Sequence, residues 1–292
     1  MAPIDCLSWE AGLSLMAFGI SFGIRVSDRR VLDHFLDYLP PGWRRAASPL
    51  VERLYSFTLS TDKSRHDAGH VNLLYANADK LVQTSDIEHV FAVFESDLQL
   101  YVAEKAHRRV FVHAGVVGWQ GQAIVLPGRS FSGKTSLVAA LVQAGATYFS
   151  DEYAVLDAHG RVHPYARPLA IRQEDGKKTR RCPVDALGGS VGTQPIPVGL
   201  VIITQYRRGA TWQPRRLSAG QGALALLDNT VSVRRQPETA LAALRCVVTR
   251  ASVFESMRGE ASVTAKYVLN DFDHYRSSAP VKGNAEKGYW ER

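Results

Sequence analysis

Glycines, a lysine and a threonine near the middle of the chain have the spacing of a phosphate-binding loop. Residues 128–135 read GRSFSGKT, which is Gly, four residues, then Gly, Lys and Thr. The glycines allow close approaches that a Cβ would obstruct, so backbone N–H groups can point at an anion. Lys134 can then reach the β- and γ-phosphates of a nucleotide, and the Thr135 hydroxyl can bind Mg²⁺. The residues expected around the nucleotide are Gly128, Arg129, Ser130, Phe131, Ser132, Gly133, Lys134, Thr135 and Ser136.

The segments on either side of this loop favour the same interpretation. QAIVLP, before the loop, is an apolar run typical of a strand. TSLVAALVQAG, after it, has apolar residues at helical spacing and ends at Gly145, where a helix C-terminal glycine is expected. Strand, glycine-rich turn and helix form the context that a phosphate-binding loop requires. The competing interpretation is a tight turn with an incidental lysine.

Two adjacent carboxylates, Asp151 and Glu152, lie sixteen residues beyond Thr135 and directly after the sequence TYFS. A strand–helix–strand unit would bring the end of the second strand beside the loop. One carboxylate there could serve as acid or base and the other could lie near Mg²⁺. The alternative is an acidic turn that is simply solvated.

Histidines and cations offer further candidates, which the sequence does not separate. His113 lies in the apolar strand VFVHAGVV, where a hydrogen-bonded core histidine competes with a catalytic one. His159 and His163 flank a turn and are expected to face solvent. A phosphoryl-transfer site also needs a cation to stabilise developing charge, while a loop of basic residues can equally well be solvated. The candidates for this cation are Arg129, Arg167, Arg172, Lys177, Lys178, Arg180 and Arg181.

Composition excludes several classes of protein. The chain has 292 residues, 46% hydrophobic content and a net charge of +7, which is ordinary for a globular protein. Its basic residues are scattered, so we expect no nucleic-acid partner. The most apolar N-terminal run, GLSLMAFGISFGI, is too short to span a bilayer and lacks a basic start, so we expect no membrane segment or signal peptide. Three widely spaced cysteines predict a reducing, cytoplasmic environment.

Periodicity predicts a domain of mixed α+β structure followed by an α/β domain. Residues 1–108 show strand patterns at 13–26, 51–60 and 71–84, and helical patterns after Asp28 and at 86–108. Residues 109–275 alternate strands and helices around the loop, apart from an expected glycine- and proline-rich loop at 174–197. Residues 276–292 are polar and are expected to form a flexible tail.

The order of these motifs resembles the catalytic core of bacterial HPr kinase/phosphorylase. The segment VHAGVV…VLPGRSFSGKTSLVAALVQAGATYFSDEYAVL carries the resemblance, which covers residues 109–157 best. It implies that Asp151 is the base for the acceptor hydroxyl, that Glu152 lies near the metal and that His113 helps to hold the acidic pair. The chain departs from the family pattern at Ser136 and Glu152, where Glu and Asp are usual, and it lacks the family's later signature for dephosphorylation.

The chain is therefore similar to divergent HPr-kinase-related proteins of peptide natural-product clusters, over most of its length. This resemblance implies a P-loop, HPr-kinase-like α/β core preceded by a smaller α+β domain. It implies transfer of a γ-phosphoryl group from ATP, or another nucleoside triphosphate, with Mg²⁺, to a Ser or Thr hydroxyl of a protein or a precursor peptide such as a lasso peptide. Two alternatives are a kinase of a small hydroxylated metabolite and a nucleotide-binding regulator without transfer. Related kinases are often oligomers, which leaves a homo-oligomer open.

Overall fold

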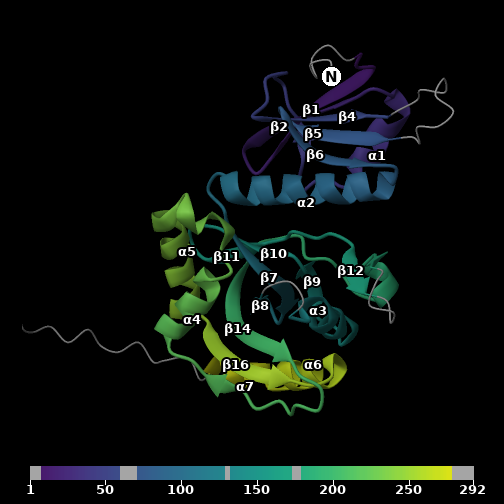
Figure 1. Ribbon diagram of the computed structural model, residues 1–292. Coiled ribbons are helices and arrows are strands. Elements are labelled where there is room, and N and C mark those ends of the chain that lie inside the picture. The colour runs from purple at the N-terminus through teal and green to yellow at the C-terminus, as the bar shows by residue number, and fades with distance from the viewer. Residues whose placement is uncertain (1–7, 60–70, 129–131, 173–178, 278–292) are drawn as a thin grey trace, which may run out of the picture. The chain divides into compact units, whose positions relative to one another are not determined.

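The computed structural model describes residues 8–59, 71–128, 132–172 and 179–277, and the chain is mixed α/β (Figure 1). It divides into two compact units, Met1–Phe111 and Val112–Arg292.

The N-terminal unit is a six-stranded sheet with the strand order β3-β1-β2-β4-β5-β6. Its strands pair antiparallel except β2 and β4, which are parallel. The sheet and its helices enclose an aromatic core in which Phe35 makes edge-to-face contacts with Phe57, Phe91 and Phe94. The elements are β1 (Ala11–Ala17), β2 (Ile20–Val26), α1 (Leu32–Leu36), β3 (Arg44–Arg45), β4 (Arg53–Thr58), β5 (Asn72–Ala76), β6 (Asp79–Thr84) and α2 (Ile87–Lys105).

Local sequence signals account for most of these elements. Asp86 caps α2, because its carboxylate accepts a hydrogen bond from the backbone N–H of Glu88 at 3.0 Å. Asp28 likewise caps the short helical segment before α1, as expected, by accepting from Arg30 N–H at 2.9 Å. In β5 every second residue is buried, which is the alternation that predicted a half-buried strand.

The C-terminal unit is built on an eight-stranded sheet with the order β11-β10-β7-β8-β14-β16-β15, and β9 pairs with β7. The central strands β8, β14 and β16 are parallel, whereas β7 is antiparallel to β8. The strands are β7 (Val110–Trp119), β8 (Gln122–Pro127), β9 (Thr147–Ser150), β10 (Tyr153–Leu156), β11 (Arg161–His163), β12 (Leu169–Arg172), β13 (Thr179–Cys182), β14 (Ile196–Tyr206), β15 (Arg215–Arg216) and β16 (Ser252–Arg258). The helices are α3 (Lys134–Gln143), α4 (Ala219–Leu227), α5 (Pro237–Arg250), α6 (Ala261–Asn270) and α7 (Phe272–Ser277).

Helix α3 follows β8 through the predicted loop and packs with α6 and α7 over one face of this sheet, while α4 and α5 lie over the other (Figure 1). Leu137, Val138 and Leu141 of α3 are buried, as their helical spacing predicted. Gly145 has φ +102°, the left-handed conformation of a helix C-terminal glycine. Strand β8, the loop and α3 thus form the strand–turn–helix unit that the motif needs.

Two expectations about the C-terminal unit need correction. The segment 174–197 is not a continuous loop, because Thr179–Cys182 forms β13 and pairs antiparallel with β12. Most of the glycines and prolines that suggested a loop come after Cys182, so they do not interrupt this ladder. The expected tail from 276 onward begins as helix, since α7 continues to Ser277, and residues 278–292 lie outside the described residues.

Candidate active site

The predicted phosphate-binding loop lies between β8 and α3. Gly133 has φ +86° and directly precedes the first helical residue, Lys134. The Lys134 ammonium group donates a hydrogen bond to the carbonyl oxygen of Gly128 at 2.5 Å, so the lysine side chain reaches across the mouth of the loop. Arg129, Ser130 and Phe131 lie outside the described residues, and Ser136 is exposed.

Both loop glycines have close side-chain neighbours, and Gly133 also has a positive φ that favours glycine. A Cβ on Gly133 would lie 2.4 Å from Nη2 of Arg258, and one on Gly128 would lie 2.8 Å from the Ser132 hydroxyl. That hydroxyl is buried and has no hydrogen-bond partner among the described residues. The loop therefore combines close backbone packing with a donor left unsatisfied, as expected of a cradle whose ligand is polar.

Arg258 is a residue of this site that sequence reasoning missed. It ends β16, is 2% exposed, and donates hydrogen bonds to the carbonyl oxygens of Gly133 at 2.7 Å and Gly259 at 2.9 Å. It forms no ion pair with any carboxylate among the described residues, and burial lowers the pKa of its guanidinium. A buried cation against the predicted loop is compatible with an anionic ligand there.

The acidic pair lies beside the loop, in the turn between β9 and β10. The Ser150 hydroxyl accepts hydrogen bonds from the N–H groups of Glu152 and Tyr153 at 3.1 and 3.0 Å, which fixes this turn. Asp151 is only 8% exposed, whereas Glu152 reaches solvent. The Asp151 carboxylate accepts a hydrogen bond from the N–H of Ala170 at 3.4 Å, and the Thr135 side chain is near enough to lower the pKa of this carboxyl group. The solvated-turn interpretation therefore does not fit Asp151.

The electrostatics of the loop and the pair are coupled. Burial raises the pKa of Asp151, and its hydrogen bonds offset part of this shift. Neighbouring groups displace part of the water around the Glu152 carboxyl group, and this effect, together with the negative charge of Asp151, raises the pKa of Glu152. Burial lowers the pKa of Lys134, and the charges of Glu152 and Asp151 act in the opposite direction. The lysine and both carboxylates are therefore close enough to act on a single bound group.

The Tyr148 hydroxyl gives Asp151 a partner for either protonation state. It lies 3.0 Å from Oδ1 of Asp151 and 2.9 Å from the carbonyl oxygen of Arg167. A hydroxyl carries one hydrogen and can also accept. It can therefore donate to an ionised Asp151, or turn its hydrogen toward Arg167 and accept from a protonated Asp151. This arrangement suits a carboxyl group that gains and loses a proton.

His113 borders the site, but its ring does not bond to the acidic pair in the structure. The imidazole is half-buried and tilted over Tyr153, with 4.7 Å between ring centroids. Burial and the positive charge of Lys134 lower the pKa of His113. The backbone of β7 makes the connection instead, since Ala114 N–H donates to the carbonyl oxygen of Glu152 at 3.1 Å.

The other predicted cations and histidines are spread more widely. Burial and the nearby Arg181 lower the pKa of Arg167 to about 10. Arg180 and Arg181 are exposed on β13, and His159 is exposed as expected. His163 is not solvent-facing, because it is half-buried and lies 3.2 Å from a carboxylate oxygen of Asp157. Lys177 and Lys178 lie outside the described residues, and the side chain of Arg172 is not described.

Comparisons with known proteins add no family to this site. The chain matches no protein-family model, and no curated protein is significantly similar to it in sequence. Among the described residues, no group of three or more His, Cys, Asp or Glu side chains is placed to hold a metal ion. Within the same part of the chain, no helix has both the length and the apolar character that a bilayer crossing needs.

Proposed function

We propose that this protein is a Mg²⁺-dependent kinase that transfers the γ-phosphoryl group of ATP, or another nucleoside triphosphate, to a Ser or Thr hydroxyl of a protein or precursor peptide. One observation carries the proposal: the acidic pair lies at the loop, because the Thr135 side chain lowers the pKa of Asp151 and the charges of Glu152 and Asp151 raise that of Lys134. A glycine-rich loop alone would suit any nucleotide-binding protein. A transfer site also needs a carboxylate at the phosphates.

The available donors fit a triphosphate and its metal. The loop amides and Lys134 would hold the phosphates, with Arg258 behind the loop. The Thr135 hydroxyl and Glu152 would hold Mg²⁺, which takes few protein ligands and completes its octahedron with phosphate oxygens and water. When bound, the metal neutralises charge on the β- and γ-phosphates.

Asp151 takes the acceptor proton in the proposed reaction. The acceptor oxygen bonds to the γ-phosphorus, the bond from that phosphorus to the β–γ bridging oxygen breaks, and the diphosphate leaves with the electron pair. The raised pKa of Asp151 suits a proton acceptor, and Tyr148 can accept a hydrogen bond from the protonated carboxyl group. The choice of a peptide acceptor rests on the resemblance to HPr-kinase-related proteins.

The test incubates the full chain with γ-labelled ATP and a pool of peptides containing Ser and Thr, with Mg²⁺ or with EDTA. The proposal expects Mg²⁺-dependent label on peptide hydroxyls. Label on small hydroxylated metabolites alone would reassign the acceptor. Tight ATP binding without transfer to peptide, metabolite or water would replace the kinase by a nucleotide-binding regulator.

A further inference from the structure

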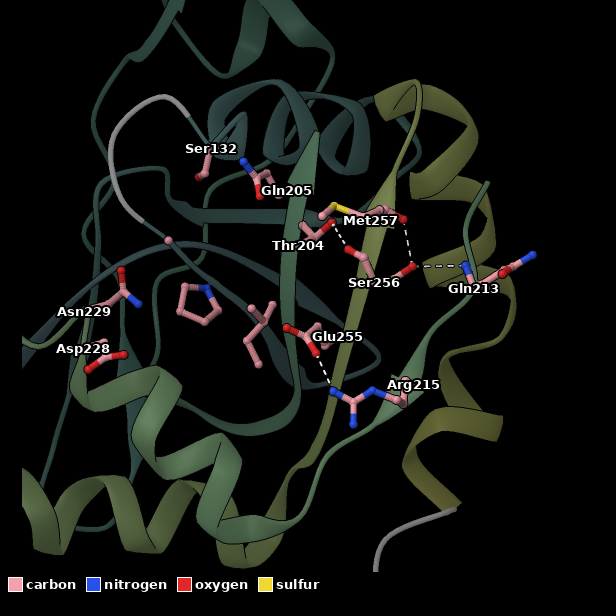
Figure 2. Close-up of a pocket in the computed structure, with 13 residues that line it drawn as sticks. Ser132, Thr204, Gln205, Gln213, Arg215, Asp228, Asn229, Glu255, Ser256 and Met257 are labelled. Carbon is pink, nitrogen blue, oxygen red and sulfur yellow. Dashed lines mark hydrogen bonds and ion pairs between the residues drawn. The ribbon is translucent and has the colours of Figure 1, made fainter. Parts of the chain in front are cut away.

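A pocket with a volume of about 980 Å³ opens beside the loop, at the carboxyl ends of β8, β14 and β16 (Figure 2). This volume is within the range of small-molecule sites, and such sites in α/β sheets occur at the carboxyl ends of strands. Gly128 and Ser132 line it at the loop, and Asn229, from the end of α4, lines it on another side. The pocket is therefore continuous with the phosphate-binding loop.

In the part of the chain that the structure describes, two buried polar atoms of this lining have no hydrogen-bond partner, Oδ1 of Asn229 and Oγ of Ser132. The Asn229 amide nitrogen donates to the carbonyl oxygen of Ala225 at 2.8 Å, which holds its side chain in place. A buried polar atom without a partner is costly, so a ligand whose hydrogen-bonding groups reach either atom would be favoured.

Strand β7 separates this pocket from the acidic pair. Neighbouring residues of a strand direct their N–H groups to opposite edges. Ala114 donates to the carbonyl oxygen of Glu152 at 3.1 Å, whereas His113 donates to the carbonyl oxygen of Asn229 at 2.7 Å. The acidic pair and the pocket thus lie on opposite edges of β7, and the loop that follows β8 lies on the pocket's side.

The direction of transfer then decides which substrate occupies the pocket. In phosphoryl transfer the attacking and leaving oxygens are roughly in line on opposite sides of the γ-phosphorus. The proposed function, on which this step rests, places the acceptor hydroxyl at Asp151. The leaving diphosphate and its nucleoside must then extend away from Asp151. We propose that the pocket beside the loop binds the nucleoside of the phosphate donor.

The chemistry of the lining suits a nucleoside better than a phosphate. Gln205 and Asn229 present carboxamides, which can donate and accept at the edge of a base. Met257 offers apolar surface for a base or sugar face, and the Asp228 carboxylate can accept from sugar hydroxyls. Figure 2 shows Asp228 across the pocket from Glu255, whose carboxylate pairs with Arg215 at 2.7 Å. Uncompensated negative charge would repel a phosphate here.

The experiment compares ATP with inorganic tripolyphosphate, which has the phosphates without the nucleoside, by calorimetric titration of the full chain. Met257→Trp fills the pocket, and Leu241→Trp is the matched control, since Leu241 is an exposed residue of α5 (52% exposed) that does not line it. We expect Met257→Trp to weaken ATP binding about tenfold or more, which is about 1.4 kcal/mol. Tripolyphosphate binding should be unchanged, and Leu241→Trp should bind both as wild type does. Gln205→Trp replaces Met257→Trp if that variant fails to fold.

Other outcomes would overturn the inference, and one would uphold it while refuting the proposed function. Unchanged ATP affinity in the variant would show that the pocket is not the nucleoside site. Equal weakening of ATP binding and tripolyphosphate binding in the variant would place phosphates in the pocket. If the wild-type chain binds both ligands with equal affinity, or binds neither, the pocket does not bind a nucleoside. A rise in peptide KM with unchanged ATP affinity would assign the pocket to the acceptor. If ATP binding depends on Met257 but no transfer occurs, the nucleoside site stands and the kinase proposal fails.

Discussion

Each unit of the protein holds an aspartate beside a buried tyrosine hydroxyl, but the two aspartates differ in charge compensation. In the N-terminal unit, Asp97 accepts a hydrogen bond from Tyr55 at 2.6 Å and pairs through both oxygens with Nη2 of Arg53, at 2.6 and 2.8 Å. In the C-terminal unit, Asp151 accepts from Tyr148 at 3.0 Å and has no ion pair among the described residues. Among the described residues, only the first carboxylate forms an ion pair.

The tyrosine protons differ in the same way. Arg53 Nε donates to the Tyr55 oxygen at 3.0 Å, so the Tyr55 hydrogen is directed to Asp97 and the cluster has one arrangement. Tyr148 lies between two acceptors and can serve either protonation state of Asp151. A buried charge that is fully paired stabilises one structure, whereas one left unpaired at a cleft is typical of a site that awaits a ligand or a proton.

The largest expected difference between the two aspartates is in phosphoryl transfer, which Asp151→Asn should lower and Asp97→Asn should not. Asn keeps the shape of the carboxyl group but cannot accept the proton, so Asp151→Asn should lower transfer on the order of 10³-fold. Nucleotide affinity should hold or rise, because a charge of the same sign as the phosphates is removed. Transfer of labelled phosphate and calorimetric ATP binding measure both quantities. Asp97→Asn should leave transfer unchanged, and wild-type transfer by Asp151→Asn would show that the proposed base is wrong.

The same two variants should change the free energy of unfolding in opposite directions. Asp97→Asn leaves the partly buried Arg53 without its counter-ion, which should lower the free energy of unfolding by about 2 kcal/mol. Burial raises the folded-state pKa of Asp151, so its neutral form favours folding at low pH and this contribution is lost as pH rises through that pKa. Asp151→Asn removes this loss. Denaturant unfolding at about pH 4 and pH 7 should show the variant gaining on wild type at the higher pH.

Lys134→Ala should have the next largest effect. It removes the positive charge that reaches across the loop, so transfer should fall on the order of 10²-fold and nucleotide binding should weaken. Lys266→Ala is the matched control, since Lys266 is an exposed residue of α6. Unchanged turnover in Lys134→Ala, with an intact circular dichroism spectrum, would refute the phosphate-binding loop.

Substitutions of Thr135 should distinguish a role in metal binding from a role in packing. Thr135→Ser keeps the hydroxyl and should keep activity, whereas Thr135→Ala should lower it about tenfold or more, because it removes the proposed Mg²⁺ ligand and the hydroxyl that lowers the pKa of Asp151. Titration of activity with Mg²⁺ after EDTA treatment should show a raised metal requirement for the Ala variant. Glu152→Gln should raise the same requirement with less loss of rate. Full activity in EDTA would exclude the metal mechanism.

Local patterns predicted the elements of this site but not all of its contacts. The strand–loop–helix unit and the acidic turn follow from residues close together in the chain, so periodicity and glycine placement indicated them. Arg258 is 125 residues from Gly133, its partner in the loop, and no local pattern marks it. Tyr148 lies three residues before Asp151, but the direction of its hydroxyl depends on Arg167, which folds back from a later segment. Long-range pairing, which a single sequence does not reveal, sets these contacts.

Tyr148→Phe should have the smallest effect and tests the difference between the two tyrosines most directly. The Tyr148 hydrogen bond lowers the pKa of Asp151 against the larger effect of burial, so its loss should raise that pKa further. Because the base must be ionised, the acidic limb of the rate–pH profile should move to higher pH. The maximal rate should fall only about threefold. Tyr55→Phe is the matched control: it should lower stability and leave the pH profile in place. If Tyr148→Phe lowers the rate equally at every pH, the hydroxyl serves packing alone, and the proton-switching role argued for Tyr148 is wrong.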